Sequence, residues 1–408
     1  MGKVGIEKVN IYGGSLCMSQ TDLAKARGKD PDVVLKDYLI DTRAIIPPYE
    51  DTVTLAANAA LPIITEEDKS QIGMLIVGTE GGVDFGKPIS TNIHEALGLH
   101  PNVRNYETKH ACYSGVAALD IAINWIKSGL NQGRKALILA ADFSRKHFLK
   151  DHEFVLGGVG AAVLVSDNPK VIEFETEKKG NWTTNIYDTY RPTAKNEMGN
   201  NEVSLFSYTD ALEGAYAHYK TFAGDIDFDT YFKKNIYHTP FPGMAFHAHR
   251  ILCNLQRNRK KSEITENFNL KVMPTLRYAQ RIGSCYGASN FVCLCGALKS
   301  CDDLNPGDRI GFFSYGSGAI GEFYSGIVTP GAREYVNNLQ IDKALDERKQ
   351  LSVKEYEEIE NIRESYIEKE NFTPDFKILD NWFDKYYKDS GKLVLNNVEE
   401  FRRTYVRV

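Results

Sequence analysis

An internal repeat is the feature that most constrains how this chain can fold. The segment Cys112-Tyr-Ser-Gly-Val-Ala-Ala-Leu begins a predicted helix, and a predicted strand follows 23 residues later at Lys135. The segment Cys285-Tyr-Gly-Ala-Ser-Asn-Phe-Val repeats this plan, with a strand 24 residues later at Arg309. Because a period of about 170 residues is too long for a solenoid, it predicts two α/β halves related by pseudo-twofold symmetry. The two helices are expected to meet at the centre.

Continuous apolar runs supply the strands of each half. Residues 73–78, 135–142 and 160–166 form such runs in the first half, as strands covered on both faces require. We therefore predict an N-terminal half over residues 1–177 and a C-terminal half over residues 178–330. Residues 331–408 change to a charged, helical pattern and are predicted to form a C-terminal extension.

Charge and cysteine content exclude several classes of protein. The net charge of −5 gives no electrostatic case for nucleic-acid binding, and no apolar run approaches the roughly 18 residues of a membrane span. The start of the chain has no apolar signal core, so a cytoplasmic protein is expected. Seven cysteines without paired Cys-x-x-Cys spacing indicate neither a disulfide framework nor a metal site.

The sequence around Cys112 is compatible with two roles, a reactive thiol and a core residue. A thiol at the start of a helix lies near the positive end of the helix dipole, which favours a reactive thiolate. Free cysteine is also a common core residue, and that alternative holds for any single cysteine. A catalytic thiol that carries an acyl group needs a base and an oxyanion donor as partners.

Glu80 and His238 are the candidate partners. Glu80 follows the apolar run at 73–78 and lies in a glycine-rich turn. His238 lies in Tyr237-His-Thr-Pro-Phe, a predicted loop before a helix, although a lone histidine is more often structural. His247 and His249 are two positions apart on that helix, a spacing that argues against a metal pair.

Two polar segments flank the second half. Residues 178–201 contain Gly180, Pro192 and Gly199, and are predicted to form a surface loop or a cap over an entrance. Residues 343–369 are rich in Glu, Lys and Arg, a pattern typical of a solvated helix face and less often of a docking surface.

Four short runs together resemble one enzyme family. Val77-Gly-Thr-Glu80, Ala111-Cys112-Tyr-Ser-Gly, Tyr237-His238-Thr-Pro-Phe and Phe313-Ser-Tyr-Gly-Ser-Gly318 occur in the order found in 3-hydroxy-3-methylglutaryl-CoA synthases. Those acyltransferases have the thiolase fold and a Glu-Cys-His site. The resemblance covers roughly residues 1–330. It implies α/β halves in five layers, αβαβα, with buried central helices between the sheets, and it implies a homodimer.

The resemblance also implies a role for each residue. Cys112 would take an acetyl group, Glu80 would remove a methyl proton, and His238 would polarise the ketone that the enolate attacks. Further residues would bind substrate, although Ser284 stands where the family usually has asparagine. These residues are Tyr190, Ser284, Ser314, Tyr315, Gly316 and Ser317.

One departure from the family bears on the substrate. The CoA-dependent enzymes carry phosphate-binding lysines on the helix after the histidine motif, and this chain has Gly243 and Phe246 there. In this respect the chain is similar to synthases of polyketide β-branching, which act on acyl groups held by the phosphopantetheine arms of donor and acceptor acyl-carrier proteins. No other cofactor is implied. A CoA-using synthase of primary metabolism and a catalytically silent scaffold that binds carrier proteins are the alternatives.

Carrier proteins are typically acidic, so this reading predicts a basic docking surface. The candidates cluster on and after the helix that follows His238, with one more near residue 145; an ordinary solvated helix face is the alternative. The candidate docking residues are Arg145, Arg250, Arg257, Arg259, Lys260 and Lys261.

Overall fold

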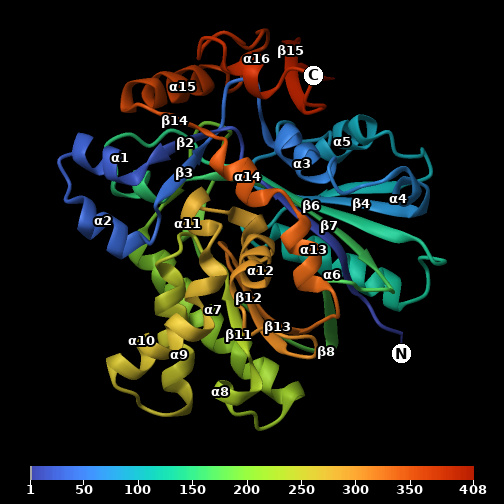
Figure 1. Cartoon of the computed structure of the whole chain (residues 1–408), viewed down its shortest axis with the longest axis vertical. Helices are drawn as coiled ribbons and strands as arrows, with labels where there is room; N and C mark the ends of the chain where they lie inside the picture. The colour runs from blue at the N-terminus through green and yellow to red at the C-terminus, as the bar shows by residue number, and fades with distance from the viewer. Residues whose placement is uncertain (1) are drawn as a thin grey trace.

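A nine-stranded mixed sheet runs through the computed structural model, which describes residues 2–408 (Figure 1). Its strand order is β11-β12-β13-β8-β1-β7-β6-β4-β5. The first half contributes β1 (Gly5–Tyr12), β4 (Ile72–Gly78), β5 (Arg104–Thr108), β6 (Lys135–Phe143) and β7 (Gly158–Ser166). The second half contributes β8 (Ile172–Thr183), β11 (Lys234–Tyr237), β12 (Arg309–Gly316) and β13 (Ile320–Val328).

The strand pairing repeats from one half to the other. In the first half β4 is parallel to β6, β6 is antiparallel to β7, and β7 is antiparallel to β1. In the second half β11, β12, β13 and β8 pair in the same order and with the same directions. The predicted duplication is therefore confirmed. Among the strands formed by residues 2–408, β5 has no counterpart in the second half.

Helices make three layers around the two halves of the sheet. Helix α6 (Ser114–Lys127) packs on β4, β6 and β7, while α12 (Ser289–Ser300) contacts β1 and β7 on one side and β11 and β12 on the other. Helices α3 (Thr52–Ala60) and α5 (Ile89–Leu97) cover the first half, and α7 (Asn201–Ala223) and α9 (Met244–Gln256) cover the second. This is the expected αβαβα order (Figure 1). A short pairing of β1 with β8 additionally joins the two sheets into one.

The two central segments meet as predicted, although both helices begin later than the sequence indicated. Ala111 and Tyr286 have positive φ angles, 42° and 46°, which an α-helix does not accommodate. Helix α6 therefore begins at Ser114, and a 3-10 turn at Tyr286–Ala288 precedes α12. A Cβ on Gly115 would lie 2.3 Å from the carbonyl oxygen of Gly287, so the two halves touch backbone to backbone here.

The segments outside this core contain more strand than expected. Strand β8 crosses the boundary predicted at residue 177, and a hairpin of β9 (Thr189–Tyr190) and β10 (Met198–Gly199) occupies the predicted loop. The C-terminal extension holds helices and three strands. They are α13 (Ala332–Asn338), α14 (Ile341–Asp346), β14 (Lys349–Leu351), α15 (Val353–Ser365), α16 (Trp382–Tyr386), β15 (Leu393–Glu399) and β16 (Arg402–Arg407).

Smaller elements complete the first and second halves. They are β2 (Leu16–Ser19), α1 (Gln20–Ala26), α2 (Pro31–Tyr38), β3 (Thr42–Ile45), α4 (Glu66–Gln71), α8 (Phe228–Tyr231), α10 (Lys261–Lys271) and α11 (Ala279–Ile282). Strand β14 extends the β2–β3 pair, and Tyr356 and Ile359 of α15 are buried against the same region. One face of the charged helix is therefore packed.

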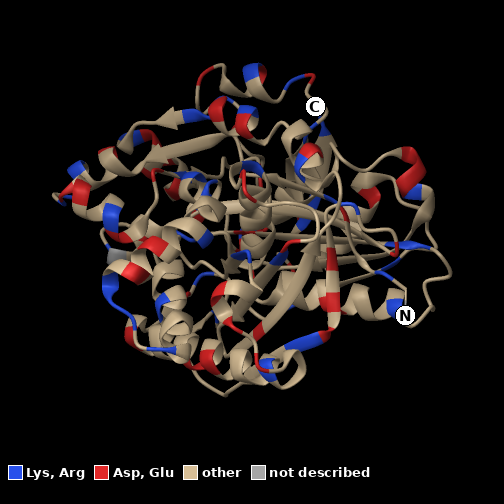
Figure 2. Ribbon diagram, turned by 60° about the horizontal axis from the view of Figure 1, so that its bottom comes forward, with Lys and Arg blue, Asp and Glu red and all other residues tan. Residues whose placement is uncertain are grey.

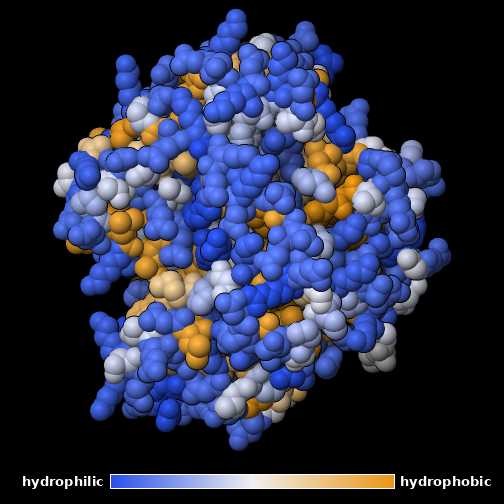
Figure 3. Space-filling model, in the orientation of Figure 1, coloured by the Kyte–Doolittle hydropathy of each residue, from blue (hydrophilic) through white to orange (hydrophobic). Residues whose placement is uncertain are grey.

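The surface is polar and carries both signs of charge. Blue and red segments are intermixed over the outer helices in Figure 2, and apolar atoms form separate patches on the hydrophilic face of Figure 3. None of the helices between residues 2 and 408 is long and apolar enough to cross a bilayer.

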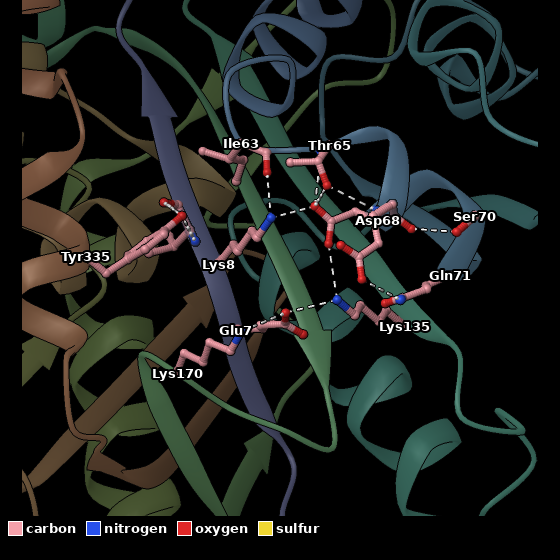
Figure 4. A network of polar contacts seen from close by, with 12 residues as sticks. Glu7, Lys8, Ile63, Thr65, Asp68, Ser70, Gln71, Lys135, Lys170 and Tyr335 are labelled. Atoms are coloured by element: carbon pink, nitrogen blue, oxygen red, sulfur yellow. Dashed lines mark hydrogen bonds and ion pairs between the residues drawn. The ribbon is translucent and has the colours of Figure 1, made fainter.

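A partly buried ion network fastens β1 to α4 and β6 (Figure 4). The Asp68 carboxylate lies 2.5 Å from Lys8 Nζ and 3.1 Å from Lys135 Nζ, and Lys135 Nζ also lies 2.9 Å from Glu7 Oε1. Burial by itself raises the pKa of Asp68, but the ion pair with Lys8 and hydrogen bonds from Thr65 and Lys135 hold it well below its usual range.

Asp68 is therefore expected to stabilise the fold above pH 4. A carboxyl whose pKa is lowered by folding stabilises the protein fully above its unfolded pKa near 3.9, and this contribution decreases below that value and is lost as the pH falls through the lower pKa of the folded state. Asp68→Asn should lower the free energy of unfolding at pH 7 by about 2 kcal/mol, because it removes the anionic partner of partly buried Lys8 and leaves Lys135 paired with Glu7 alone. Urea unfolding at pH 7 and pH 3 measures this.

Glu66→Gln on the same helix is the matched control. Glu66 is 89% exposed and pairs with Lys69, so its loss should change the free energy of unfolding by less than about 0.5 kcal/mol. Equal losses for the two variants would contradict the role given to Asp68.

Candidate active site

Glu80 and Cys112 come together at the ends of two parallel strands. The pairing of β4 with β5 aligns Gly78 with Thr108, so the chain leaves both strands at the same edge of the sheet. Ligand sites of open α/β sheets lie at this edge. Here Cys112 Sγ lies 3.6 Å from Glu80 Oε2. Of the seven cysteines, all reduced, Cys112 alone keeps partial exposure, as a nucleophile requires.

His238 occupies the related place in the second half. It directly follows β11, the strand that corresponds to β4 in the pairing order. Its backbone N–H donates to the Phe313 carbonyl at 2.7 Å, and Tyr208 Oη donates to the His238 carbonyl at 2.8 Å. The imidazole is buried, and burial lowers the pKa of His238 to about 3. At neutral pH it is therefore an uncharged imidazole, suited to polarise a carbonyl rather than to supply a positive charge.

The glycine-rich segment at the end of β12 joins these two parts. The His238 and Tyr315 rings lie 6.3 Å apart. A Cβ on the next residue, Gly316, would lie 2.5 Å from the His110 carbonyl and 2.6 Å from Tyr113 Cβ, so this backbone touches the turn that carries Cys112. His238 and Cys112 thus flank the same short segment.

The remaining residues of this loop have distinct environments. Ser314 is buried, and Tyr315 Oη donates to Asp188 Oδ2 at 2.6 Å. Ser317 is half-buried, and the backbone N–H of Gly318 donates to Asp188 Oδ1 at 2.9 Å. Asp188 therefore holds the loop at Tyr315 and at Gly318, on either side of half-buried Ser317.

Tyr190 and Ser284 differ in exposure. Tyr190 is 36% exposed on β9, with its ring 5.2 Å from that of Tyr187. Ser284 is buried, and its backbone N–H donates to the Val155 carbonyl at 2.9 Å. The structure gives Ser284 a clear role in joining the halves; its contact with substrate stays a prediction.

Burial and charge control the two reactive groups. Burial raises the pKa of Glu80, Glu197 raises it further, and the Arg191 guanidinium 3.1 Å away acts in the opposite direction. Burial, followed by the charge of Glu80, raises the pKa of the Cys112 thiol well above its usual value. The thiolate expected from the helix dipole is therefore not favoured in the resting site, where α6 begins only at Ser114, two residues after Cys112.

Asp142 is a site residue that the sequence reasoning missed. It ends the apolar run of β6, and its Oδ1 accepts hydrogen bonds from Thr79 Oγ1 and from the backbone N–H groups of Glu80 and Gly81 at 2.7 to 3.0 Å. Burial and the nearby Glu80 charge raise the pKa of Asp142 to about 8. The sequence does contain a signal for Asp142, because a carboxylate at the end of a buried strand is the same feature that points to Glu80.

Arg191 and Glu197 were also missed. They lie in the hairpin of β9 and β10, and Arg191 is ion-paired with both Glu80 and Glu197. The run Tyr187-Asp-Thr-Tyr-Arg191 drew attention to Tyr190 alone. Nothing local distinguishes Arg191 from a surface arginine before the fold places it beside Glu80.

The basic docking candidates divide into two groups. Four side chains on and after α9 are exposed, and these are Arg250, Arg257, Lys260 and Lys261. Arg259 is instead held by Asp229, with Nη2 2.7 Å from Oδ2. Arg145 is half-buried and lines a cavity of about 450 Å³ between the loop after Glu80 and the C-terminal extension.

Comparison with known proteins gives a consistent result. Models of the N-terminal and C-terminal parts of hydroxymethylglutaryl-coenzyme A synthase match residues 2–170 and 252–408. The polyketide biosynthesis 3-hydroxy-3-methylglutaryl-ACP synthase PksG of Bacillus subtilis is 38% identical, over 99% of each chain. The hydroxymethylglutaryl-CoA synthase of Enterococcus faecalis is 32% identical over 87% of this chain and 90% of that one.

Solved structures extend this likeness to three dimensions. The HMG synthase of the curacin biosynthetic pathway, solved alone and with apo, holo and acetyl donor-ACP, superposes with a TM-score of 0.95. It is 38% identical to this chain, and the match covers 100% of both.

Proposed function

Because the chain belongs to the hydroxymethylglutaryl-coenzyme A synthase family, we propose that it adds an acetyl group to the β-ketone of a carrier-bound 3-ketoacyl chain. The 3.6 Å contact between Cys112 Sγ and Glu80 Oε2 carries the chemical part of this proposal. The 38% identity to an ACP synthase over 99% of the chain supports acyl-carrier proteins as donor and acceptor. Gly243 and Phe246, which stand in place of lysines, support the same substrates. The substrates would arrive on their phosphopantetheine arms.

The proposed reaction begins with acyl transfer. Cys112 Sγ attacks the acetyl thioester of the donor carrier protein, and the carrier thiol leaves with the proton that Cys112 gives up. Glu80 then removes a proton from the methyl group of acetyl-S-Cys112, which produces the enolate. A buried carboxylate whose pKa is raised is a stronger base for this step than an exposed one.

Condensation and hydrolysis complete the cycle. The enolate carbon attacks the ketone carbon of the acceptor chain, while neutral His238 donates a hydrogen bond to the ketone oxygen. The alkoxide formed takes up one proton and becomes a hydroxyl, and Glu80 gives up the one proton it had removed, so it is again a carboxylate. Water then cleaves the thioester, and this frees Cys112 and leaves a 3-hydroxy-3-carboxymethyl product on the acceptor carrier. A β-branch of this kind is what polyketide pathways introduce with such enzymes.

Two other functions remain as candidates. The 32% identity to the Enterococcus faecalis enzyme favours a CoA-using synthase as the second. A silent scaffold that binds carrier proteins is the third, and the contact between Cys112 and Glu80 argues against it.

Mass spectrometry of the protein incubated with acetyl-carrier protein or acetyl-CoA separates the three functions. We expect one acetyl group on Cys112 from the carrier and little from CoA. Equal labelling from CoA would favour the CoA-using synthase, and no labelling would favour the scaffold.

Glu80→Ala should still become acetylated but should not condense, because it lacks the base. A condensing Glu80→Ala variant would contradict the role of Glu80.

The exposed basic residues after α9 are proposed to bind the acidic carrier protein. The double change Arg257→Glu and Lys260→Glu should lower kcat/KM with carrier-bound acetoacetyl about tenfold, because charge reversal slows association. Acetylation from a small thioester such as acetyl-pantetheine should stay unchanged. Lys388→Glu, an exposed lysine of the C-terminal extension, is the control. Unaltered kinetics in the double variant would remove this surface from the proposal.

Strand β5 supports a homodimer. It is the last strand of the sheet, pairs only with β4, and all five of its residues are exposed or half-exposed. An open strand edge can pair with a second copy. Light scattering of the purified protein should give twice the chain mass of 45.8 kDa. A mass of one chain at micromolar concentration would contradict the dimer.

A further inference from the structure

Arg191 joins the proposed base to a second carboxylate. Its Nη2 lies 3.1 Å from Glu80 Oε1 and 2.8 Å from Glu197 Oε2. The side chains of Arg191, Glu80 and Glu197 are only 12%, 14% and 16% exposed. One guanidinium is therefore shared between two carboxylates in a space that water enters little, where charge interactions are stronger than on the surface.

The hairpin of β9 and β10 holds Arg191 and Glu197 opposite each other. Tyr190 of β9 pairs with Met198 of β10. The loop that connects the two strands therefore begins at Arg191 and ends at Glu197. The hairpin is fixed in turn to the glycine-rich segment, because Asp188 accepts from the backbone N–H of Gly318 at 2.9 Å. The position of Arg191 therefore depends on the fold and not on a free surface loop.

The contacts of Glu80 give its two oxygens different tasks. Oε1 faces Arg191, while Oε2 faces Cys112 Sγ at 3.6 Å. Without Arg191 nothing among these contacts would decide which oxygen points to the thiol. The acetyl methyl group would be attached through Cys112, on the side of Oε2.

Other ionisable groups lie near Arg191, Glu80 and Glu197 on the neighbouring elements. Asp142 at the end of β6 binds the backbone of Glu80, and Arg145 follows on the next loop. His147 Nε2 lies 3.8 Å from Glu197 Oε2, and the Arg191 guanidinium lies 6.0 Å from the centre of the Tyr286 ring. These groups are common to all the variants considered below, so they do not determine the direction of the effects.

We propose that Arg191 and Glu197 are paired positioning residues: Arg191 orients Glu80, and Glu197 limits how much positive charge Arg191 directs at it. The inference rests on the proposed role of Glu80 as the base. A guanidinium committed to Glu80 alone would hold the carboxylate ionised but weaken it as a base. Sharing with Glu197 keeps the orientation and preserves the basicity.

The pair makes two opposite predictions for the pH dependence of condensation. The rate should rise with pH as Glu80 loses its proton. Arg191→Gln removes a charge that lowers the pKa of Glu80, so this rise should move to higher pH by roughly one unit. Glu197→Gln removes a charge that raises the pKa of Glu80, so the rise should move to lower pH by a similar amount.

The measurement is a single-turnover condensation of acetylated enzyme with carrier-bound acetoacetyl, followed from pH 5 to 9. Lys195→Gln is the matched control, since Lys195 is a cation of the same loop, is 55% exposed and pairs with Glu368. It should leave the profile in place. Arg191→Lys keeps the charge but not the two-sided contact, so it should restore the position of the profile at a lower rate. Shifts in the same direction, or no shift in either Gln variant, would overturn the proposal.

A second measurement needs no acyl substrate and separates this inference from the proposed function. Arg191 also lowers the pKa of the Cys112 thiol, so Arg191→Gln should move iodoacetamide alkylation of Cys112 to higher pH, whereas Lys195→Gln should not. If the wild-type protein accepts no acetyl group, the proposed function fails, and the alkylation profile still decides whether Arg191 sets the charge beside Glu80 and Cys112. An Arg191→Gln profile equal to that of wild type would refute it.

Discussion

Close backbone contact between the two halves is the constraint on which the rest of this structure depends. Gly115 approaches the carbonyl of Gly287, and Gly316 approaches the turn that carries Cys112, at distances that leave no room for a Cβ. Interiors pack too tightly to absorb such an overlap without moving backbone. These glycines therefore set the separation of Cys112 from the second half, which supplies His238.

Once the halves are in contact, burial becomes the main influence on the chemistry. Burial keeps His238 neutral, raises the pKa of Glu80 and keeps the Cys112 thiol protonated in the resting enzyme. A low local dielectric also strengthens the pull of Arg191 on Glu80. The helix dipole, which the sequence suggested as the activator of Cys112, does not keep the pKa of this thiol from being raised well above its usual value.

Duplication explains why residues from distant parts of the chain share one site. Strands β4 and β11 occupy related places in the two halves, since each is parallel to its neighbour, β6 or β12. Glu80 follows β4 and His238 follows β11. The pseudo-twofold arrangement brings these strand ends to the same central turn. The equivalent cysteine of the second half, Cys285, is buried and its Sγ donates to the Gly283 carbonyl, so that copy has kept a structural role.

The sequence by itself determined the duplicated α/β plan, the strand ends and the candidate trio, because these depend on local patterns: apolar runs, glycine turns and a polar residue directly after a strand. Only the tertiary structure decided which charges act on them. Asp142 and Arg191 lie 62 and 111 positions from Glu80 along the chain, and a salt bridge or hydrogen bond over such a separation leaves no local pattern. For the same reason only the fold places half-buried Arg145 in a hollow shared with the C-terminal extension, and its docking role stays a prediction. Residue types and their order are local properties, whereas the electric field at Glu80 is a sum over side chains that folding alone assembles.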